Sequence, residues 1–547
     1  MRSRLFRLLP LIALAAAPVL AKAPAKPAIS LETLKTVTEA LSSDAFEGRA
    51  PGTPGEEKTV ALIAERFAKA GLKPGNGSSW YQDVPLVEIT AKNIQPLVFT
   101  GGKGRVSLAF STDMVVGTSR VVPHVDVADS DVVFVGYGIN APEKGWNDYA
   151  GVDVKGKTVI ILVNDPDYQT KTLEGPFNGR AMTYYGRWTY KFEEAARQGA
   201  AAAIIVHDTE PAAYPWGVIQ SSWDGARIGA DDVNNHMDQS PAIGWMQLDS
   251  AKKVLAAAGQ DFDTLSAAAR QKGFKAVPLG LKAAVSFDTG IRKRVSKNVV
   301  GVLPGTARPN DYVLFTAHWD HLGICPPVAG DNICNGALDN ATGTAGLIAL
   351  AEASAKAGPA ARSMLFVAVT AEESNLLGSQ YYAEHPLHPL AQTVGGVNMD
   401  VLNVFGRSKD IVVTGPGKSQ LDEYLKRAAA AQGRTIGVET TPEKGHYYRS
   451  DHFSFAKLGV PMLAAGSGED LEKGGPAAGA AASEEYVAKH YHQPSDEYDP
   501  NWDWSGAIQD LELYYAIGRE LAEGKDWPNW TEGDEFRAIR DKSRAGK

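Results

Sequence analysis

The chain has 547 residues, of which 44% are hydrophobic and 22% charged, the composition of a globular protein. That length is too great for one ordinary core and predicts two or more domains. A formal net charge of −9 argues against a general nucleic-acid-binding surface, so we expect no nucleic-acid partner.

The first residues have the pattern of a targeting signal. Arg2, Arg4 and Arg7 precede the short apolar run Leu8 to Leu20, and small residues follow for cleavage. This run is shorter than the roughly 20 residues that span a bilayer, which disfavours a membrane anchor. No cysteine follows it, which excludes a bacterial lipoprotein anchor. We predict a signal peptide over residues 1–21, a periplasmic or secreted protein, and no membrane span after cleavage.

Two helices are expected after this leader. Ile29 to Leu41 has helical spacing, and a second helix, Glu57 to Ala70, stops at Gly71. Between them lies the stretch F-E-G-R-A-P-G-T-P-G-E, whose glycines and prolines exclude a regular element. By itself this loop is typical of an ordinary turn.

From about residue 121 the character of the chain changes. Strands are expected at 132–137, 158–163 and 202–206, with one helix at 190–198. This block carries no plausible cluster of metal ligands, so its isolated polar groups are interpreted as structural.

Strands alternate with helices from about residue 281 to the end. This alternation predicts an α/β fold in which helices sandwich a mostly parallel, mixed sheet. The stretch Glu469 to Glu485 is rich in Gly and Ala and is expected to be a surface loop. The expected strands are 299–303, 312–317, 363–370, 394–399, 410–414 and 460–463, and the expected helices are 342–356, 419–432 and 504–523.

Imidazole and carboxylate groups stand where these expected strands end. The strand Tyr312 to Ala317 runs directly into His318, and in open α/β sheets the carboxyl ends of strands are where ligands bind. Nitrogen and carboxylate-oxygen ligands in this mixture suit zinc, with Co²⁺ or Mn²⁺ as substitutes. The candidate ligands are His318, Asp339, Glu372 or Glu373, Asp400, and His490 or His492.

Six motifs that contain these residues resemble the co-catalytic two-zinc exopeptidases of clan MH. They are A-H-W-D-H-L-G, N-G-A-L-D-N-A-T-G, T-A-E-E, N-M-D, R-S-D-H-F-S-F-A-K-L-G-V-P and Y-H-Q-P-S-D, and they occur in the order found in that clan. The clan includes bacterial leucine aminopeptidase, glutamate carboxypeptidase II and glutaminyl cyclase. The resemblance implies a zinc exopeptidase domain made of residues 29–120 and 281–530. It also implies an inserted, β-rich protease-associated domain at 121–280.

The resemblance also implies a role for each site residue. Asp339 bridges two Zn²⁺ ions, with a cis peptide bond after it. His318 and Asp400 complete one ion, and Glu373 and His492 the other. Glu372 is the expected general base, because adjacent side chains leaving a strand point in different directions.

Other residues are expected to support the site. Asp320 is predicted to accept the second N–H of His318 and fix its tautomer. Tyr491 is predicted to donate to the oxyanion of the reaction, with a merely packed tyrosine as the alternative. Three residues on one loop are predicted to contact substrate: Ser450, Asp451 and His452. The histidines interpreted as bystanders are His321, His385, His388, His446 and His490.

Cys325 and Cys334 are the only cysteines and lie in one loop between two of the motifs. In an oxidising compartment they can pair, so we predict a disulfide; two free thiols are the alternative.

The leading functional hypothesis is an exported dizinc aminopeptidase that acts on peptide substrates. A carboxypeptidase or dipeptidase on the same scaffold stays open, because the sequence does not place the group that reads the peptide terminus. Glutaminyl cyclase, with a single zinc, and a binding protein without catalysis are further alternatives. The complete ligand set and Glu372 argue against loss of catalysis. The sequence assigns no oligomeric state.

Overall fold

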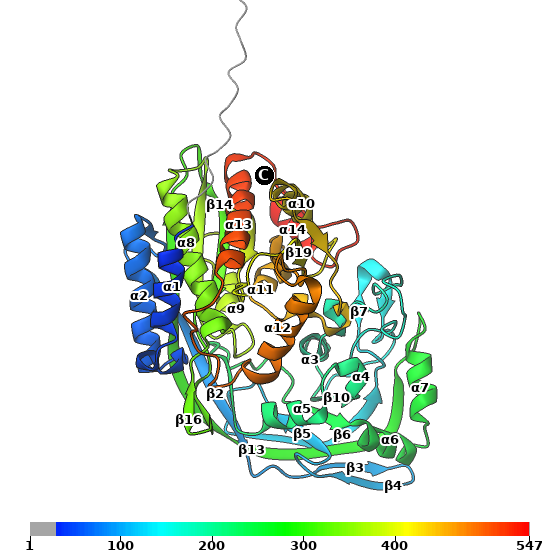
Figure 1. Cartoon of the computed structure of the whole chain (residues 1–547). Coiled ribbons are helices and arrows are strands. Elements are labelled where there is room, and N and C mark those ends of the chain that lie inside the picture. The colour runs from blue at the N-terminus through cyan, green and yellow to red at the C-terminus, as the bar shows by residue number, and fades with distance from the viewer. Residues whose placement is uncertain (1–28, 546–547) are drawn as a thin grey trace, which may run out of the picture.

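The computed structural model describes residues 29–545; the predicted signal peptide, 1–21, lies outside them. The chain forms two parts that share two long strands, β2 (Tyr81–Lys92) and β13 (Val277–Leu303) (Figure 1). These strands are antiparallel neighbours from Tyr81 opposite Val299 to Lys92 opposite Asp288.

The first part is built around a mixed sheet whose centre is parallel. β17 (Arg362–Val369), β14 (Arg308–His318), β18 (Thr393–Asn398) and β21 (Met462–Ser467) are adjacent in that order and parallel. The end of β13 pairs antiparallel with β17 on one side, and β19 (Asp410–Val413) pairs antiparallel with β21 on the other. The predicted mostly parallel, mixed sheet is therefore confirmed.

Helices cover both faces of this sheet, as the alternation of elements predicts. One face packs against α8 (Thr342–Lys356), α10 (Leu421–Ala431) and α13 (Ser505–Glu523). The N-terminal helices α1 (Leu31–Leu41) and α2 (Pro54–Ala70) join the same hydrophobic cluster. The opposite face packs against α9 (Leu377–Glu384) and α11 (His452–Lys457). Residues near the N-terminus and residues after 298 thus form one core.

The second part has its own core, and its strands join the same large sheet through β13. β6 (His124–Phe134), β9 (Thr158–Leu162), β10 (Ala202–His207) and β12 (Ala242–Gln247) are parallel in that order. Three earlier strands, β3 (Leu97–Gly101), β4 (Gly104–Leu108) and β5 (Met114–Gly117), also pack in this core. Residues 97–117 therefore belong structurally to the second part, ahead of the expected boundary at 121.

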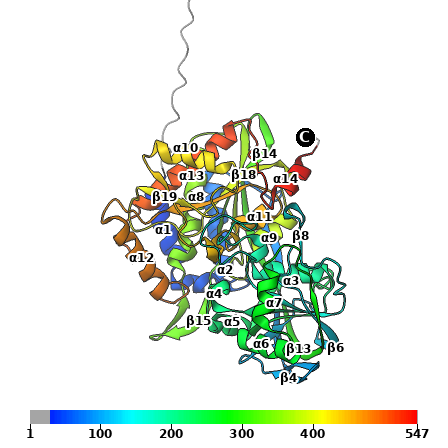
Figure 2. The same ribbon diagram turned by 90° about the vertical axis from the view of Figure 1, so that its right-hand side faces the viewer.

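The remaining elements belong to one part or the other. In the second part they are α3 (Trp188–Arg197), α4 (Thr209–Ala212), α5 (Trp216–Trp223), β11 (Ala226–Ala230), α6 (Leu248–Ala257), α7 (Phe262–Ala269) and the short pair β7 (Asn140–Ala141) and β8 (Trp146–Asn147). In the first part they are β1 (Lys73–Pro74), β15 (Gly323–Val328), β16 (Asp331–Cys334), β20 (Thr435–Gly437), α12 (Gly475–Lys489) and α14 (Arg537–Arg544). Figure 2 shows the second part below the helices of the first.

One expected loop is a helix. Most of Glu469 to Glu485 lies in α12, which begins with a proline in its first turn. Its alanines are good helix formers, but Gly479 is its only buried residue. A helix without an apolar face has no hydrophobic period, which is why the sequence pattern did not predict it.

Among residues 29–545, none of the helices combines the length and apolar character needed to cross a bilayer.

Candidate metal centre

The five predicted ligands converge at one edge of the central sheet. His318 is the last residue of β14, Glu373 follows β17, and Asp400 follows β18. Because these strands are parallel neighbours, their carboxyl ends meet at the same edge. Asp339 comes from the turn before α8, and His492 from the loop after α12.

The ligand atoms form two groups that share Asp339. His318 Nε2 lies 3.4 Å from Asp339 Oδ1 and 3.2 Å from Asp400 Oδ1. His492 Nε2 lies 3.5 Å from Asp339 Oδ2 and 3.0 Å from Glu373 Oε2. Each oxygen of Asp339 therefore faces one histidine, which is the arrangement expected of a bridging carboxylate.

The donor set fits two divalent cations. His492 Nε2 is buried and makes no hydrogen bond of normal geometry, although two carboxylates lie close to it. Burial lowers the pKa of His492, but Asp339 and Glu373 outweigh it and raise the pKa to about 10. Burial likewise raises the pKa of Asp339, yet His318 and His492 hold it well below its usual range. The three carboxylates outnumber the two imidazoles, so positive charge between them would stabilise the cluster.

Asn340 joins the turn of Asp339 to the loop of Asp400. Its Oδ1 accepts from the backbone N–H groups of Gly343 at 2.9 Å and Val401 at 3.1 Å, and its Nδ2 donates to Met399 O at 3.1 Å. The peptide bond from Asp339 to Asn340 is cis, as the resemblance predicts.

Asp496 holds the backbone of the bridging residue. Its Oδ1 accepts from the N–H of Leu338 at 2.9 Å, and its Oδ2 accepts from that of Asp339 at 3.1 Å. The Tyr486 hydroxyl also donates to Oδ2, at 3.2 Å. Local patterns assign Asp496 no role, although it is the last residue of the Y-H-Q-P-S-D motif.

Arg49 connects the N-terminal segment to the metal loops. The fully buried guanidinium donates to the carbonyl of Trp319 at 2.9 Å and to that of Gly336 at 2.8 Å. It also donates to the carbonyls of Leu41 and Asn335. Burial lowers its pKa to about 10, against the opposing effect of nearby carboxylates. The loop that contains Arg49, which by itself is typical of an ordinary turn, thus helps to hold the backbone of the metal loops in position.

The predicted role of Asp320 differs from the observed one. His318 Nδ1 lies 3.2 Å from the backbone carbonyl of Asp320 but 3.8 Å from its carboxylate, so the carbonyl is the acceptor within hydrogen-bonding distance. The carboxylate instead accepts from the backbone N–H of Glu372 at 3.1 Å. Asp320 therefore positions the candidate base through its side chain.

His321, expected to be a bystander, is a partner of a candidate ligand. Its Nδ1 lies 2.7 Å from Glu373 Oε1, and its ring is buried. Glu373 is therefore engaged by His321 on one oxygen and by His492 on the other. The sequence signal that could have indicated this role is the position of His321 as the second histidine of the H-W-D-H motif.

The three predicted substrate contacts have other positions. Ser450 Oγ donates to Asp400 Oδ2 at 2.6 Å and accepts from Asn398 Nδ2 at 2.8 Å, so it orients a ligand. Asp451 and His452 are 0% and 1% exposed, which removes both from contact with substrate in this structure. Ser450 thus faces the candidate ligand Asp400, whereas the side chains of Asp451 and His452 are buried.

The candidate base and Tyr491 face a cavity of about 590 Å³ that both parts of the chain line. Glu372, Glu373 and Tyr491 contribute from the first part, and residues of α3, α5 and β11 from the second. Tyr491 stacks on His492, with ring centroids 3.9 Å apart, and is 43% exposed. Burial raises the pKa of Glu372 well above its usual value.

Left-handed backbone occurs at several positions in the site. Ala371, before Glu372, has φ 53°; Val401, after Asp400, has φ 63°; His492 itself has φ 60°. Such conformations are uncommon outside glycine and cluster where function requires a fixed side-chain direction.

Cys325 of β15 and Cys334 of β16 form a disulfide with an S–S distance of 2.13 Å. The bond joins the two strands of a hairpin that leads into the turn of Asp339.

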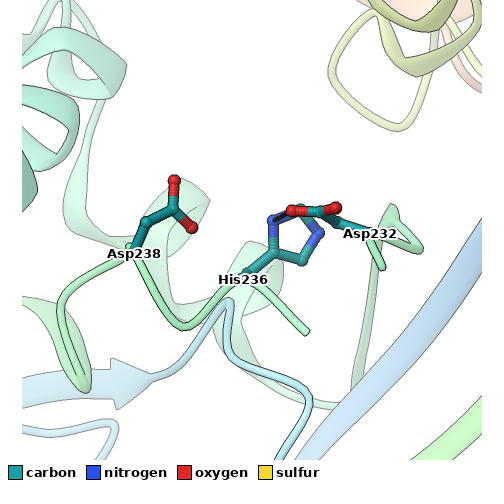
Figure 3. A group of neighbouring side chains, drawn as sticks. All are labelled: Asp232, His236 and Asp238. Carbon is teal, nitrogen blue, oxygen red and sulfur yellow. Dashed lines mark ion pairs between the residues drawn. The ribbon is translucent and has the colours of Figure 1, made fainter. Parts of the chain in front are cut away.

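A separate group of Asp232, His236 and Asp238 follows β11. Figure 3 shows the imidazole between the two carboxylates. His236 Nε2 lies 2.5 Å from the carbonyl of Ala230, and Asp238 is exposed. We assign this group no role.

Comparison with known proteins identifies the domain that holds the site. Mouse aminopeptidase NAALADL1 is 31% identical over 215 residues, which cover 34% of this chain and only 27% of the mouse protein. Aminopeptidase YwaD of Bacillus subtilis is 26% identical over 492 residues, 87% of this chain and 83% of that protein. The solved aminopeptidase from Aneurinibacillus sp. strain AM-1 aligns over 90% of this chain and 94% of its own, with a TM-score of 0.48 and 20% identity.

Residues 298–516 match the model of peptidase family M28. The match includes all five candidate ligands and Glu372. The chain therefore carries a peptidase family M28 domain, which confirms the resemblance to clan MH exopeptidases and the predicted class of enzyme, a metallopeptidase.

Proposed function

We propose that the chain is a dizinc aminopeptidase. The observation that carries the proposal is the pair of ligand groups that share Asp339, with His318 and Asp400 on one side and Glu373 and His492 on the other. Zinc bound there supplies Lewis-acid activation of water and of the scissile carbonyl.

Glu372 is the proposed general base. Its carboxylate lines the cavity, and its backbone is held by Asp320. It takes a proton from the attacking water and gives it to the leaving amine. Tyr491, which is exposed and stacks on His492, is the proposed donor to the developing oxyanion.

The relatives from mouse and Bacillus subtilis are both named aminopeptidases, which supports cleavage from the N-terminal end. Carboxypeptidase or dipeptidase action is the second candidate, because both parts of the chain line the cavity and a terminal carboxylate has room to enter it. A single-zinc cyclase fits less well, since the two ligand groups are equally complete.

The test combines metal content with a substrate panel: an aminoacyl anilide, an N-acetylated peptide of the same sequence and a dipeptide, each with and without chelator. We expect about two zinc ions per chain, loss of hydrolysis on chelation and recovery with zinc. Free-amine substrates should be cleaved and the acetylated peptide should resist. Cleavage of the acetylated peptide from its C-terminal end would establish carboxypeptidase action instead.

We also propose that the protein is exported and that the second part is a protease-associated domain. The leader pattern of residues 1–21 and the disulfide support export to an oxidising compartment. Expression with the leader in a bacterial host, followed by N-terminal sequencing of the periplasmic fraction, tests cleavage after residue 21. An uncleaved chain confined to the cytoplasm would contradict export.

A further inference from the structure

Three arginines line the cavity that contains the candidate base. Arg187 immediately precedes α3, Arg227 lies in β11, and Arg449 follows the short turn His446–Tyr448. Two of them come from the second part of the chain and one from the first. Both views place α3 beneath α9 and α11, where the parts face each other (Figures 1 and 2). The cavity therefore has carboxylates and candidate metal ligands on one side and guanidinium groups on another.

These arginines differ from the other cations around them. Among residues 29–545, none of the three arginines forms a salt bridge or donates a side-chain hydrogen bond to a carboxylate. By contrast, Lys457, which also lines the cavity, pairs with Glu193 at 2.7 Å. Arg180, seven residues before Arg187, pairs with Glu443 at 3.1 Å. The lack of partners is thus a property of the cavity-lining arginines and not of this region in general.

Burial desolvates two of the unpaired groups. The Nε atom of Arg187 is buried and has no hydrogen-bond partner. Arg227 stacks over the ring of Trp223, with its guanidinium carbon 3.9 Å from the ring centroid. Burial lowers the pKa of both arginines to about 10, and the charge of Arg449 adds to the effect on Arg187. Both stay charged at neutral pH, and a desolvated charge without a partner is costly.

A ligand that brings a carboxylate would remove this cost. Guanidinium groups bind carboxylates with paired, charge-assisted hydrogen bonds, and do so better than lysine at partly buried sites. The cavity volume of about 590 Å³ lies within the range of pockets that enclose a small ligand. A short peptide therefore fits it better than an internal stretch of a folded protein.

We propose that Arg187 and Arg449 bind a carboxylate of the substrate, with Arg227 adding positive charge to the same cavity, so that the enzyme selects short peptides that carry one. The proposal rests on the proposed peptidase function and specifies its substrate class. The carboxylate has two sources, the C-terminus of a di- or tripeptide and the side chain of an acidic residue after the scissile bond. Both present the same chemistry to the arginines.

Matched substrates distinguish the sources. The first pair is Leu-Gly-Gly and its C-terminal amide; the second is Leu-Glu-Gly-amide and Leu-Gln-Gly-amide. If the arginines bind the C-terminal carboxylate, kcat/KM is higher for the free acid than for the amide in the first pair. If they bind an acidic side chain, kcat/KM is higher for the glutamate peptide in the second pair. The expected preference is roughly 10- to 100-fold, the size of a hydrogen bond to a charged group.

Substitution then assigns the preference to the arginines. Arg187→Gln and Arg449→Gln should each lower kcat/KM for the preferred carboxylate substrate at least tenfold more than for its neutral partner. Arg180→Gln is the matched control, because it removes a paired arginine of the same region that does not line the cavity. It should retain the wild-type preference. Arg449 is exposed, so its variant keeps the test valid if Arg187→Gln fails to fold.

A binding measurement separates this inference from the proposed function. Calorimetry with the zinc-loaded Glu372→Gln chain, which should not turn over substrate, compares Leu-Gly-Gly with its amide and the two second-pair peptides with each other. Tighter binding of a carboxylate peptide, lost on adding Arg187→Gln or Arg449→Gln, supports the inference even if wild-type hydrolysis fails. Equal binding and equal kcat/KM within both pairs overturns it, while hydrolysis of all four peptides leaves the aminopeptidase proposal standing.

Discussion

The backbone N–H of Glu372 donates to Oδ1 of Asp320 at 3.1 Å, which ties the candidate base to the loop that follows the neighbouring strand. Asp320 follows His318 by two residues, so one short loop positions both a metal ligand and the base. Because the Asp320 carboxylate is fully buried, solvent cannot replace this hydrogen bond.

Asp320→Ala should therefore slow catalysis without removing metal. Loss of the acceptor frees the Glu372 backbone, and a small displacement of a catalytic group can cost on the order of 10²-fold in kcat. Asp320→Asn keeps an oxygen acceptor and should lose less. The measurement is kcat with zinc content for both variants; a zinc-free Asp320→Ala chain would show that the residue serves the ligands instead.

Glu372→Gln and Glu373→Gln should have different effects. Glutamine cannot take the proton of water at neutral pH, so Glu372→Gln should lose about 10²- to 10⁴-fold in kcat and keep its zinc. Glu373→Gln should lower zinc occupancy as well as rate, because Glu373 contacts both His321 and His492. Elemental analysis beside single-turnover kinetics checks both. The opposite pattern would mean that the two roles are exchanged.

Asp496→Ala should weaken metal binding from outside the ligand set. Asp496 fixes the backbone of Asp339, and removing such a support typically costs 10- to 100-fold in metal affinity. Competition with a zinc chelator measures the affinity. Asp496→Asn, which keeps one acceptor, should lie between the wild type and Asp496→Ala. Unchanged affinity in both variants would refute the assignment.

Arg49→Lys should destabilise the fold. Lysine cannot supply the four directed hydrogen bonds that Arg49 makes to backbone carbonyls, and each buried carbonyl left unpaired costs about 1–3 kcal/mol. Urea unfolding should show a lower midpoint for this variant. Lys58→Arg, an exposed change on α2, is the control. A midpoint equal to that of the wild type would contradict the supporting role.

Stability should fall as the pH drops from neutral, in part through His452. Burial lowers the pKa of this histidine to about 3, and among the described residues neither ring nitrogen makes a hydrogen bond of normal geometry. Below its unfolded pKa of about 6.5 the unfolded chain takes up a proton that the folded chain refuses. The loss from this group approaches about 1.4 kcal/mol per pH unit between about 6.5 and 3.

His452→Phe removes that contribution. Urea unfolding at pH 7 and pH 5 should show a smaller loss for the variant than for the wild type, whatever the other groups contribute. An identical loss in both chains would mean that His452 titrates normally when folded.

The sequence was informative where chemistry and secondary structure coincide. His318, Glu373 and Asp400 follow buried apolar strands, so both the strands and their polar ends could be recognised. Helix α8 was predicted with its observed bounds, because Gly358 and Pro359 end it.

Long-range contacts were beyond the reach of local patterns. Arg49 is separated from Trp319 by 270 residues, so only the fold shows that its turn supports the site. The sequence pattern also did not show where the second part begins, because β2 runs from the first part into the second as one uninterrupted strand. His452 and Asp451 look like any polar loop residues, and only packing shows that they are buried.

The pairing of β2 with β13 bears on how the two walls of the cavity are held apart. The two parts are joined by a continuous antiparallel ladder from Tyr81 to Lys92, and not by a flexible linker. Such a ladder twists more readily than it folds at a hinge, so the separation between the opposing walls of the cavity is set by the sheet. The candidate base and the proposed carboxylate-binding arginines therefore lie on two parts whose spacing is set by a sheet and not by a hinge.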